Sequence, residues 1–253
     1  EEFEIDAHTL LLLHGNGSPS GASGENPTHA PGISYAEGKF GKAIDLSTLG
    51  FLRYAAAGNI SAAEGPLEFW LMPHWNGIDF ESHTALSWGL WGGLLMGKDG
   101  GNYWINIANR WGPGGVPQYG CGYNVAGWTA GQWYHCAFTW SSQRVRIFVN
   151  GTPVSENPVN ATLPAIQDGY FEIGAESGSP SLNGVIDELR ISDIVRADAE
   201  ILDSYLRGLP RAETAVAWGS NVVTQDMTGP YLAFSAGLEF AVAQRPDGTL
   251  AAW

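Results

Sequence analysis

Short stretches in which apolar and polar residues alternate recur along most of the chain. A period of two is typical of half-buried β-strands, and β-branched and aromatic residues favour extended backbone. We therefore predict strands over residues 9–14, 41–46, 50–55, 67–73, 84–89, 93–98, 102–108, 119–125, 133–140, 144–151, 170–175 and 184–192. Segments rich in Gly and Pro, such as 15–32 and 110–118, separate them and indicate loops. The pair Asn150-Gly151 predicts a tight hairpin turn.

Only residues 197–208 show the period of a helix. Ile201, Leu202, Tyr205 and Leu206 share one face, and Gly208 is a typical C-terminal stop. Many short strands with a single short helix predict an all-β fold, an antiparallel β-sandwich of the jelly-roll type.

Composition and charge narrow the class of protein. Of 253 residues, 44% are hydrophobic and 15% are charged, which is enough apolar material for a folded core. The net charge of −14 repels phosphate backbones and anionic membrane surfaces, so we expect no nucleic-acid partner. The apolar runs are too short for membrane insertion. The acidic, Trp-rich and Lys-poor composition favours an extracellular or cell-surface protein. The chain starts at Glu1 without Met or signal peptide, so we expect a piece of a larger secreted protein with other domains.

Seven segments occur in a familiar order. They read LLLHGNG (11–17), GKAIDL (41–46), PLEFWLMP (66–73), GQWYHCAFTW (131–140), RVRIFVNGTPV (144–154), YFEIGA (170–175) and LNGVIDELRISDIVRADAEI (182–201). In this order they resemble laminin-G-like, concanavalin A-like lectin/glucanase jelly-roll domains. The last segment is the most specific, and the resemblance covers roughly residues 9–207. It implies a jelly-roll domain over 1–207, but this fold hosts many functions.

The residues after the helix resemble something else. AVAWGSN (215–221) and YLAFSAGLEFAVAQRPDGTLAAW (231–253) are similar to a single β-propeller repeat of the regulator-of-chromosome-condensation type. One repeat cannot close a propeller ring. We predict a linker over 208–214 and a partial propeller-like repeat, a small β appendage, over 215–253. The alternative is that these strands pack on the sandwich.

Aromatic residues crowd the middle of the chain, where nine of the 11 Trp lie between Trp70 and Trp140. The resemblance assigns Trp70, Trp133 and Trp140 to the core. Indole and phenol rings stack on the C–H faces of sugars, while amides and Arg bind the hydroxyls. We therefore predict binding of a polysaccharide or glycan through Trp88, Trp91, Trp104, Asn106, Arg110, Trp111, Tyr119 and Trp128. At least one of the loop residues Trp111 and Trp128 is expected to be exposed.

Catalysis has weaker support. Glycosidases need two carboxyl groups roughly 5–9 Å apart, and Asp79 and Glu81 are the weak candidates between Trp75 and Trp140. Lyase chemistry would need a base such as His83, His135 or Tyr103 beside Arg110. The leading hypothesis is a non-catalytic carbohydrate-binding module. A protein-binding or adhesion module and a polysaccharide-degrading enzyme, a glycoside hydrolase or lyase, are the alternatives.

The resemblance also implies a structural Ca²⁺ ion where the first and last strands meet. Asn16 stands where the family often has an acid, Asp187 matches the acid of the terminal motif, and Gly41 offers a carbonyl. The alternative for Asp187 is a hydrogen-bonding role. Cys121 and Cys136 flank a candidate hairpin and are predicted to form a disulfide across neighbouring strands; the alternative is two buried thiols.

Overall fold

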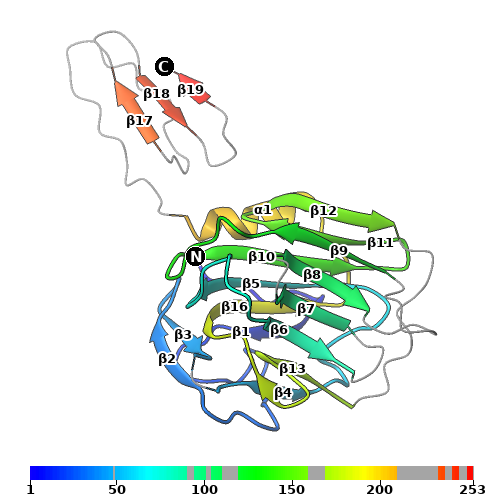
Figure 1. The fold of residues 1–253 in the computed structure, drawn as a ribbon. Coiled ribbons are helices and arrows are strands. Elements are labelled where there is room, and N and C mark those ends of the chain that lie inside the picture. The colour runs from blue at the N-terminus through cyan, green and yellow to red at the C-terminus, as the bar shows by residue number, and fades with distance from the viewer. Residues whose placement is uncertain are drawn as a thin grey trace.

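Two antiparallel sheets face each other across an apolar core (Figure 1). The computed structural model describes residues 1–47, 49–89, 94–100, 104–109, 119–158, 169–209, 233–236, 241–244 and 250–252. Only the backbone is described for 104–109, for 119 and for the last three ranges. The predicted all-β antiparallel sandwich is confirmed, and each of the predicted strand ranges overlaps a strand.

The larger sheet has the order β12-β11-β10-β5-β16-β3-β2, and β1 also pairs with β16. Its strands are β1 (Thr9–Leu13), β2 (Ser34–Glu37), β3 (Lys42–Asp45), β5 (Gly65–Pro73), β10 (Tyr134–Trp140), β11 (Arg144–Val149), β12 (Thr152–Pro158) and β16 (Gly184–Ser192). Because β16 lies between β5 and β3 and also pairs with β1, the beginning of the chain lies beside the end of the sandwich.

The smaller sheet has the order β4-β13-β6-β7-β8-β9. Its strands are β4 (Leu52–Ala55), β6 (His83–Trp88), β7 (Leu94–Asp99), β8 (Trp104–Asn109), β9 (Tyr119–Asn124) and β13 (Tyr170–Ile173). From β6 to β9 the strands follow chain order as a meander, so the connections between them alternate between the two ends of the sheet.

Two further sheets, of two and three strands, contain the remaining described strands. β14 (Ala175–Glu176) pairs with β15 (Ser179–Pro180) in a short hairpin. β17 (Ala233–Ala236), β18 (Ala241–Gln244) and β19 (Leu250–Ala252) form a three-stranded antiparallel sheet. This sheet lies within the residues predicted as a β appendage; its likeness to a propeller repeat stays a prediction.

Two strands of the larger sheet, β2 and β12, have no predicted range of their own, although the hairpin turn predicted at Asn150-Gly151 implies β12. β2 reads Ser-Tyr-Ala-Glu, and its four residues are exposed or only half-buried. The strand forms because each of its residues pairs with β3 across a four-residue turn. Pairing rather than an apolar pattern defines β2, so a search for alternating apolar positions misses it.

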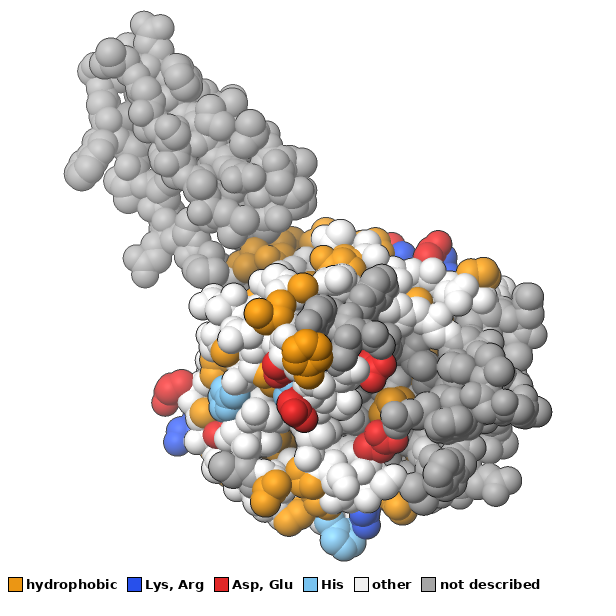
Figure 2. Space-filling model, in the orientation of Figure 1, with side chains coloured by type: hydrophobic (Ala, Val, Ile, Leu, Met, Phe, Trp, Pro, Cys, Tyr) orange, Lys and Arg blue, Asp and Glu red, His pale blue; other side chains and the backbone are white. Residues whose placement is uncertain are grey.

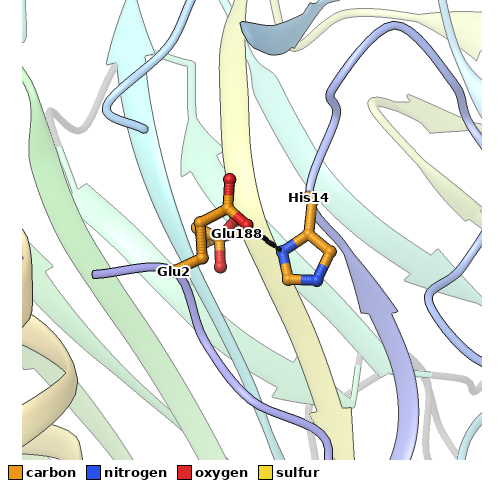
Figure 3. A group of neighbouring side chains, drawn as sticks. All are labelled: Glu2, His14 and Glu188. Carbon is orange, nitrogen blue, oxygen red and sulfur yellow. Dashed lines mark hydrogen bonds and ion pairs between the residues drawn. The ribbon is translucent and has the colours of Figure 1, made fainter. Parts of the chain in front are cut away.

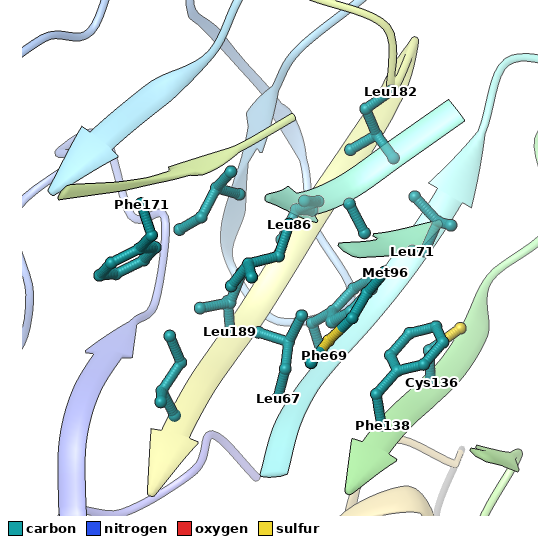
Figure 4. Packing of buried hydrophobic residues seen from close by; sticks show 14 of the residues in the cluster. Leu67, Phe69, Leu71, Leu86, Met96, Cys136, Phe138, Phe171, Leu182 and Leu189 are labelled. Carbon is teal, nitrogen blue, oxygen red and sulfur yellow. The ribbon is translucent and has the colours of Figure 1, made fainter. Parts of the chain in front are cut away.

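The apolar core lies between the two sheets (Figure 4). β5 contributes Leu67, Phe69 and Leu71, and Phe138 on β10 stacks on Phe69 with ring centroids 6.2 Å apart. The smaller sheet supplies side chains such as Met96. Burying one such side chain contributes roughly 1.5–3 kcal/mol, so this layer dominates the stability of the sandwich.

Helix α1 (Asp198–Arg207) packs on the outer face of the larger sheet, so the predicted helix is confirmed. Tyr205 stacks on Trp70 of β5, with ring centroids 5.7 Å apart. Arg196 is buried just before the helix; it donates to Ser192 Oγ at 3.0 Å and forms an ion pair with Asp6 at 2.8 Å. The Arg of the terminal sequence motif therefore joins the last strand, the helix start and the N-terminal segment.

Candidate functional site

Four rings stack in a row just beyond the end of β5. Trp75 lies 4.4 Å from His83 and 6.0 Å from Trp128, measured between ring centroids. Tyr134 stacks on Trp128 at 4.1 Å. Trp128 is 7% exposed and Trp75 is 5% exposed. Neither indole therefore offers a free face to a sugar.

The prediction of Trp128 as a ligand contact is wrong, because its loop turns inward onto the core. The N–H of Trp128 donates to Val125 O at 2.8 Å, and the N–H of Gly131 donates to Pro73 O at 2.8 Å. The loop after β5 packs so closely on this turn that a Cβ at Gly77 would lie 1.6 Å from Val125 O. This close contact is made at Gly77, whereas a Cβ at Gly127 or Gly131, the two glycines on either side of Trp128, would meet nothing within 4 Å.

Trp88 is the second buried candidate, at 5% exposed. It belongs to the core cluster, and β6 lies between β13 and β7 with every residue buried. The prediction that Trp88 contacts a ligand is therefore wrong. The interior positions of Trp70 and Trp140, both 1% exposed, are as predicted.

Four strand ends line up at one end of the smaller sheet. The register pairs Trp88 with Leu94, Leu94 with Asn109, and Asn109 with Tyr119. The segments that join these ends, 90–93 and 110–118, carry the predicted ligand contacts Trp91, Arg110 and Trp111, which lie outside the described residues.

The backbone of the other predicted ligand contacts lies on β8 and β9, but Trp104 begins β8 at the end of the sheet opposite the aligned strand ends. Trp104 and Asn106 are on β8, opposite Asn124 and Gly122 of β9, and Tyr119 begins β9. Apart from Trp88 and Trp128, six predicted ligand contacts remain. They are on β8, at the start of β9, or in the two segments attached to the aligned strand ends.

Asp79, one of the two weak catalytic candidates, is engaged in a structural ion pair. Its Oδ1 accepts from Lys98 Nζ at 2.6 Å, and its Oδ2 lies 2.9 Å from His83 Nε2. Lys98 is 3% exposed and also donates to the carbonyls of Asp79 and Glu81, each at 2.9 Å. Burial alone would raise the pKa of Asp79, but the hydrogen bonds from Lys98 and His83 outweigh it and lower the pKa.

An ionised, fully engaged carboxylate is unsuited to general acid catalysis. The Glu81 side chain is exposed, and only its backbone carbonyl contacts Lys98. This geometry fits a role of Asp79 in holding the loop before β6 to the end of β7.

The three predicted calcium ligands surround the turn between β2 and β3. Asp187 Oδ2 accepts the N–H of Phe40, and Asn16 Oδ1 accepts the N–H of Lys42, each at 2.8 Å. The carbonyl of Gly41 accepts from the N–H of Gly38 at 3.0 Å. Sequence reasoning thus identified three residues that meet in space.

Their oxygens, however, already serve the backbone of the turn. Asp187 is completely buried, and a Cβ at Gly38 would lie 2.6 Å from its Oδ2. Burial raises the pKa of Asp187 to about 7, although the N–H groups of Phe40, Glu188 and Lys39 oppose this rise. Ca²⁺ takes six to eight oxygen ligands, and these three residues in this arrangement do not fit such an ion. Calcium binding stays a prediction.

The predicted disulfide is wrong, because Cys121 and Cys136 are both free. Cys121 lies on β9 of the smaller sheet, where its Sγ is 3.7 Å from Val145 O. Cys136 lies on β10 of the larger sheet, buried in the core. The two residues flank a loop that crosses from one sheet to the other, so they are not cross-strand neighbours.

A buried charged group on β5 was missed by sequence reasoning. Glu68 Oε2 accepts from Arg190 Nη2 at 2.6 Å, and its Oε1 lies 3.3 Å from His135 Nε2. Burial raises the pKa of Glu68, but His135 and Arg190 outweigh it and bring the pKa to about 2. A single acid inside the apolar run PLEFWLMP is the sequence signal that could have indicated this ion pair.

Acidic side chains are spread over the face shown in Figure 2, and its few basic side chains lie near the margins. This distribution agrees with the net charge of −14 and does not suit a phosphate backbone. Among the described residues, no helix is long and apolar enough to cross a membrane.

Comparison with solved structures finds domains of similar fold. Domain 4 of AbnA, an extracellular arabinanase from Geobacillus stearothermophilus solved with arabinotriose, matches with a TM-score of 0.60 and 20% identity, covering 79% of this chain and 100% of that one. The botulinum neurotoxin serotype D ligand binding domain, solved with N-acetylneuraminic acid, matches with a TM-score of 0.62 and 12% identity, covering 78% of this chain and 50% of that one. The binding domain of Paraclostridial Mosquitocidal Protein 1 gives 0.59 and 12%, covering 79% of this chain and 52% of that one.

At these identities the likeness shows the fold. The chain spans about half the length of the two toxin domains. No curated protein matches the sequence. The family model described as the concanavalin A-like lectin/glucanases superfamily matches residues 61–202, more than half of the chain. The chain therefore belongs to the concanavalin A-like lectin/glucanases superfamily.

Proposed function

We propose that this protein is a non-catalytic carbohydrate-binding module that binds a polysaccharide or glycan at the aligned strand ends of the smaller sheet. The alignment of Trp88, Leu94, Asn109 and Tyr119 carries the proposal. It brings the attachment points of segments 90–93 and 110–118 to the same end of the sheet. Trp91 and Trp111 would stack on sugar rings, and Arg110 would bind hydroxyl groups.

Two observations support binding of sugar without cleavage. Similar folds have been solved with arabinotriose and with N-acetylneuraminic acid. In this chain, Asp79 is committed to Lys98 and His83. An enzyme using Asp79 would have to break this ion pair before each turnover.

The setting that we propose is a modular extracellular protein. One of the similar structures is itself a single domain of an extracellular enzyme. In such a protein, a binding module holds other domains close to an insoluble or repetitive substrate and raises their effective concentration there.

Binding to a panel of polysaccharides and sialylated glycans, followed by titration of the best ligand, tests the proposal. We expect Trp111→Ala and Arg110→Ala each to weaken binding at least about tenfold, in line with loss of a dominant contact. Phe80→Ala is the matched control, because this exposed aromatic precedes β6 at the other end of the sheet. Binding of no glycan on the panel, or equal weakening by Phe80→Ala, would overturn the proposed site. Release of reducing ends by the parent protein would show an enzyme instead.

A further inference from the structure

Three side chains from distant parts of the sequence converge beside the middle of β16 (Figure 3). Glu2 belongs to the N-terminal segment, His14 directly follows β1, and Glu188 lies on β16. His14 Nδ1 is 2.8 Å from Glu188 Oε1 and 3.8 Å from Glu2 Oε2. One ligand atom from each residue lies within 4.8 Å of the other two.

A bulge in β16 places Glu188 in this group. Asp187 pairs with Trp70 and Arg190 with Glu68, so Glu188 and Leu189 together face the single residue Phe69. Glu188 has φ +51°, an uncommon backbone conformation for a residue with a side chain. Successive residues of a regular strand point to opposite faces, so without the bulge one acid of the Asp187-Glu188 pair would enter the apolar core.

The group carries more negative charge than its protein partners balance. Glu188 is completely buried, and its other oxygen accepts the N–H of Phe3. A single imidazole faces two carboxylates, whereas a divalent cation would neutralise both.

We propose that Glu2, His14 and Glu188 bind one divalent transition-metal ion, for which Zn²⁺ is the best match. Zn²⁺ is commonly bound by His nitrogen and carboxylate oxygen at about 2.0–2.2 Å, which separates tetrahedral ligands by about 3.4 Å. The two distances from His14 Nδ1, 2.8 and 3.8 Å, lie on either side of this value. The exposed side chain of Glu2 has the freedom to close the site around the ion.

The ligand chemistry separates this site from the predicted calcium site. Ca²⁺ selects oxygen ligands, whereas an imidazole ligand favours zinc, copper or nickel. Asn16, a predicted calcium ligand, is not a ligand of the proposed zinc site. Its Nδ2 donates to Glu2 Oε1 at 2.7 Å and so orients that carboxylate. Since the ligands come from the N-terminal segment, β1 and β16, the bound ion would fasten the first residues to the last strand. None of them belongs to the proposed glycan site.

The experiment uses the full chain, freed of metal with EDTA and dialysed, and titrates ZnCl₂ by calorimetry. We expect one ion per chain, and at least about tenfold weaker binding in Glu2→Gln and in His14→Gln. His8→Gln is the matched control, because His8 also lies beside a carboxylate, that of Asp193 at 3.0 Å. It should bind Zn²⁺ like the parent. Both ligand variants replace partly exposed side chains, and circular dichroism verifies that they fold.

Co²⁺ provides an independent readout, because a four-coordinate Co²⁺ ion in a protein site absorbs visible light much more strongly than the hydrated ion. The parent and His8→Gln should give this absorption, and His14→Gln should lose it. The proposal is overturned if the parent binds no Zn²⁺, or if both ligand variants bind it as tightly as the parent. It is also overturned if millimolar Ca²⁺ displaces the ion, since the site would then be an oxygen site for calcium.

Discussion

The imidazole of His83 lies flat against the indole of Trp75, with ring centroids 4.4 Å apart and planes that differ by 7°. Both nitrogens of this imidazole face oxygen: Nδ1 lies 2.8 Å from Ser181 O, and Nε2 lies 2.9 Å from Asp79 Oδ2. One histidine therefore joins the row of stacked rings to the Asp79–Lys98 ion pair. Residues that looked like sugar platforms or catalytic groups in the sequence hold this end of the sandwich together.

Shortening Trp128 tests the structural role of the stacked rings. Trp128→Ala leaves a cavity beside Trp75 and Tyr134, and we expect it to lower the free energy of unfolding by about 3–5 kcal/mol. Trp128→Phe keeps an aromatic ring and should cost less. Urea unfolding followed by circular dichroism measures both. A Trp128→Phe protein that is as stable as the parent but binds no glycan would contradict the buried role.

Neutralising Asp79 tests the ion pair. Asp79→Asn leaves Lys98 buried without its carboxylate partner, and we expect a loss of about 2 kcal/mol, moderated because the Asp79 carboxylate is partly exposed. Glu81→Gln is the control, since the Glu81 side chain is exposed, and it should change stability by less than about 0.5 kcal/mol. Thermal unfolding compares the two variants. Equal melting temperatures for Asp79→Asn and the parent would show that the pair is not stabilising.

Strand positions followed from the sequence because burial on one face of a sheet leaves an alternating pattern, as in β4 and β7. The sequence also marked the last strand of the sandwich, because Arg196 and Asp187 belong to the terminal motif. In the fold, Arg196 pairs with Asp6, and Asp187 accepts the N–H of Phe40. Exposure of a given indole was not predictable. Trp128 is buried by the packing of two loops against each other, and the sequence does not encode this contact locally. The bulge at Glu188 is likewise set by the pairing of β16 with β5, and the sequence does not encode this pairing locally.

Removing calcium tests whether a bound Ca²⁺ ion stabilises the turn between β2 and β3. Because the oxygens of Asn16, Gly41 and Asp187 already accept backbone N–H groups, we expect the melting temperature to be the same in millimolar CaCl₂ and in EGTA. Asp187→Ala should nevertheless destabilise the protein in both conditions, because it removes the acceptor from buried N–H groups. A melting temperature raised by CaCl₂ and unaffected by MgCl₂ would restore the predicted calcium site.

Glu68 gives the stability of the protein a defined dependence on pH. Its pKa is about 2 in the folded state, below the ordinary value of 4.5, so its ionised form stabilises the fold. This contribution is fully present above about pH 4.5 and is lost as the pH falls towards 2. The difference corresponds to roughly 3 kcal/mol. Glu68→Gln should therefore be less stable than the parent at pH 7, and its stability should fall less steeply between pH 5 and 2, which urea titrations at fixed pH measure. Parallel pH profiles of parent and variant would contradict this account.

The last prediction concerns Gly208, which follows helix α1. Its φ of −85° suits any residue, so replacing this glycine with alanine should stabilise the protein by about 0.4–1 kcal/mol if backbone entropy alone mattered. A Cβ at this position, however, would lie 2.1 Å from Cζ2 of Trp70. Because Trp70 is itself buried under Tyr205, either the indole or the end of the helix must shift, and we expect Gly208→Ala to cost about 1–3 kcal/mol. Gly127→Ala is the matched control, since a Cβ there meets nothing within 4 Å. Thermal unfolding should show a lower melting temperature for Gly208→Ala alone, and equal stability of the two variants would mean that the helix end is free to move away from Trp70.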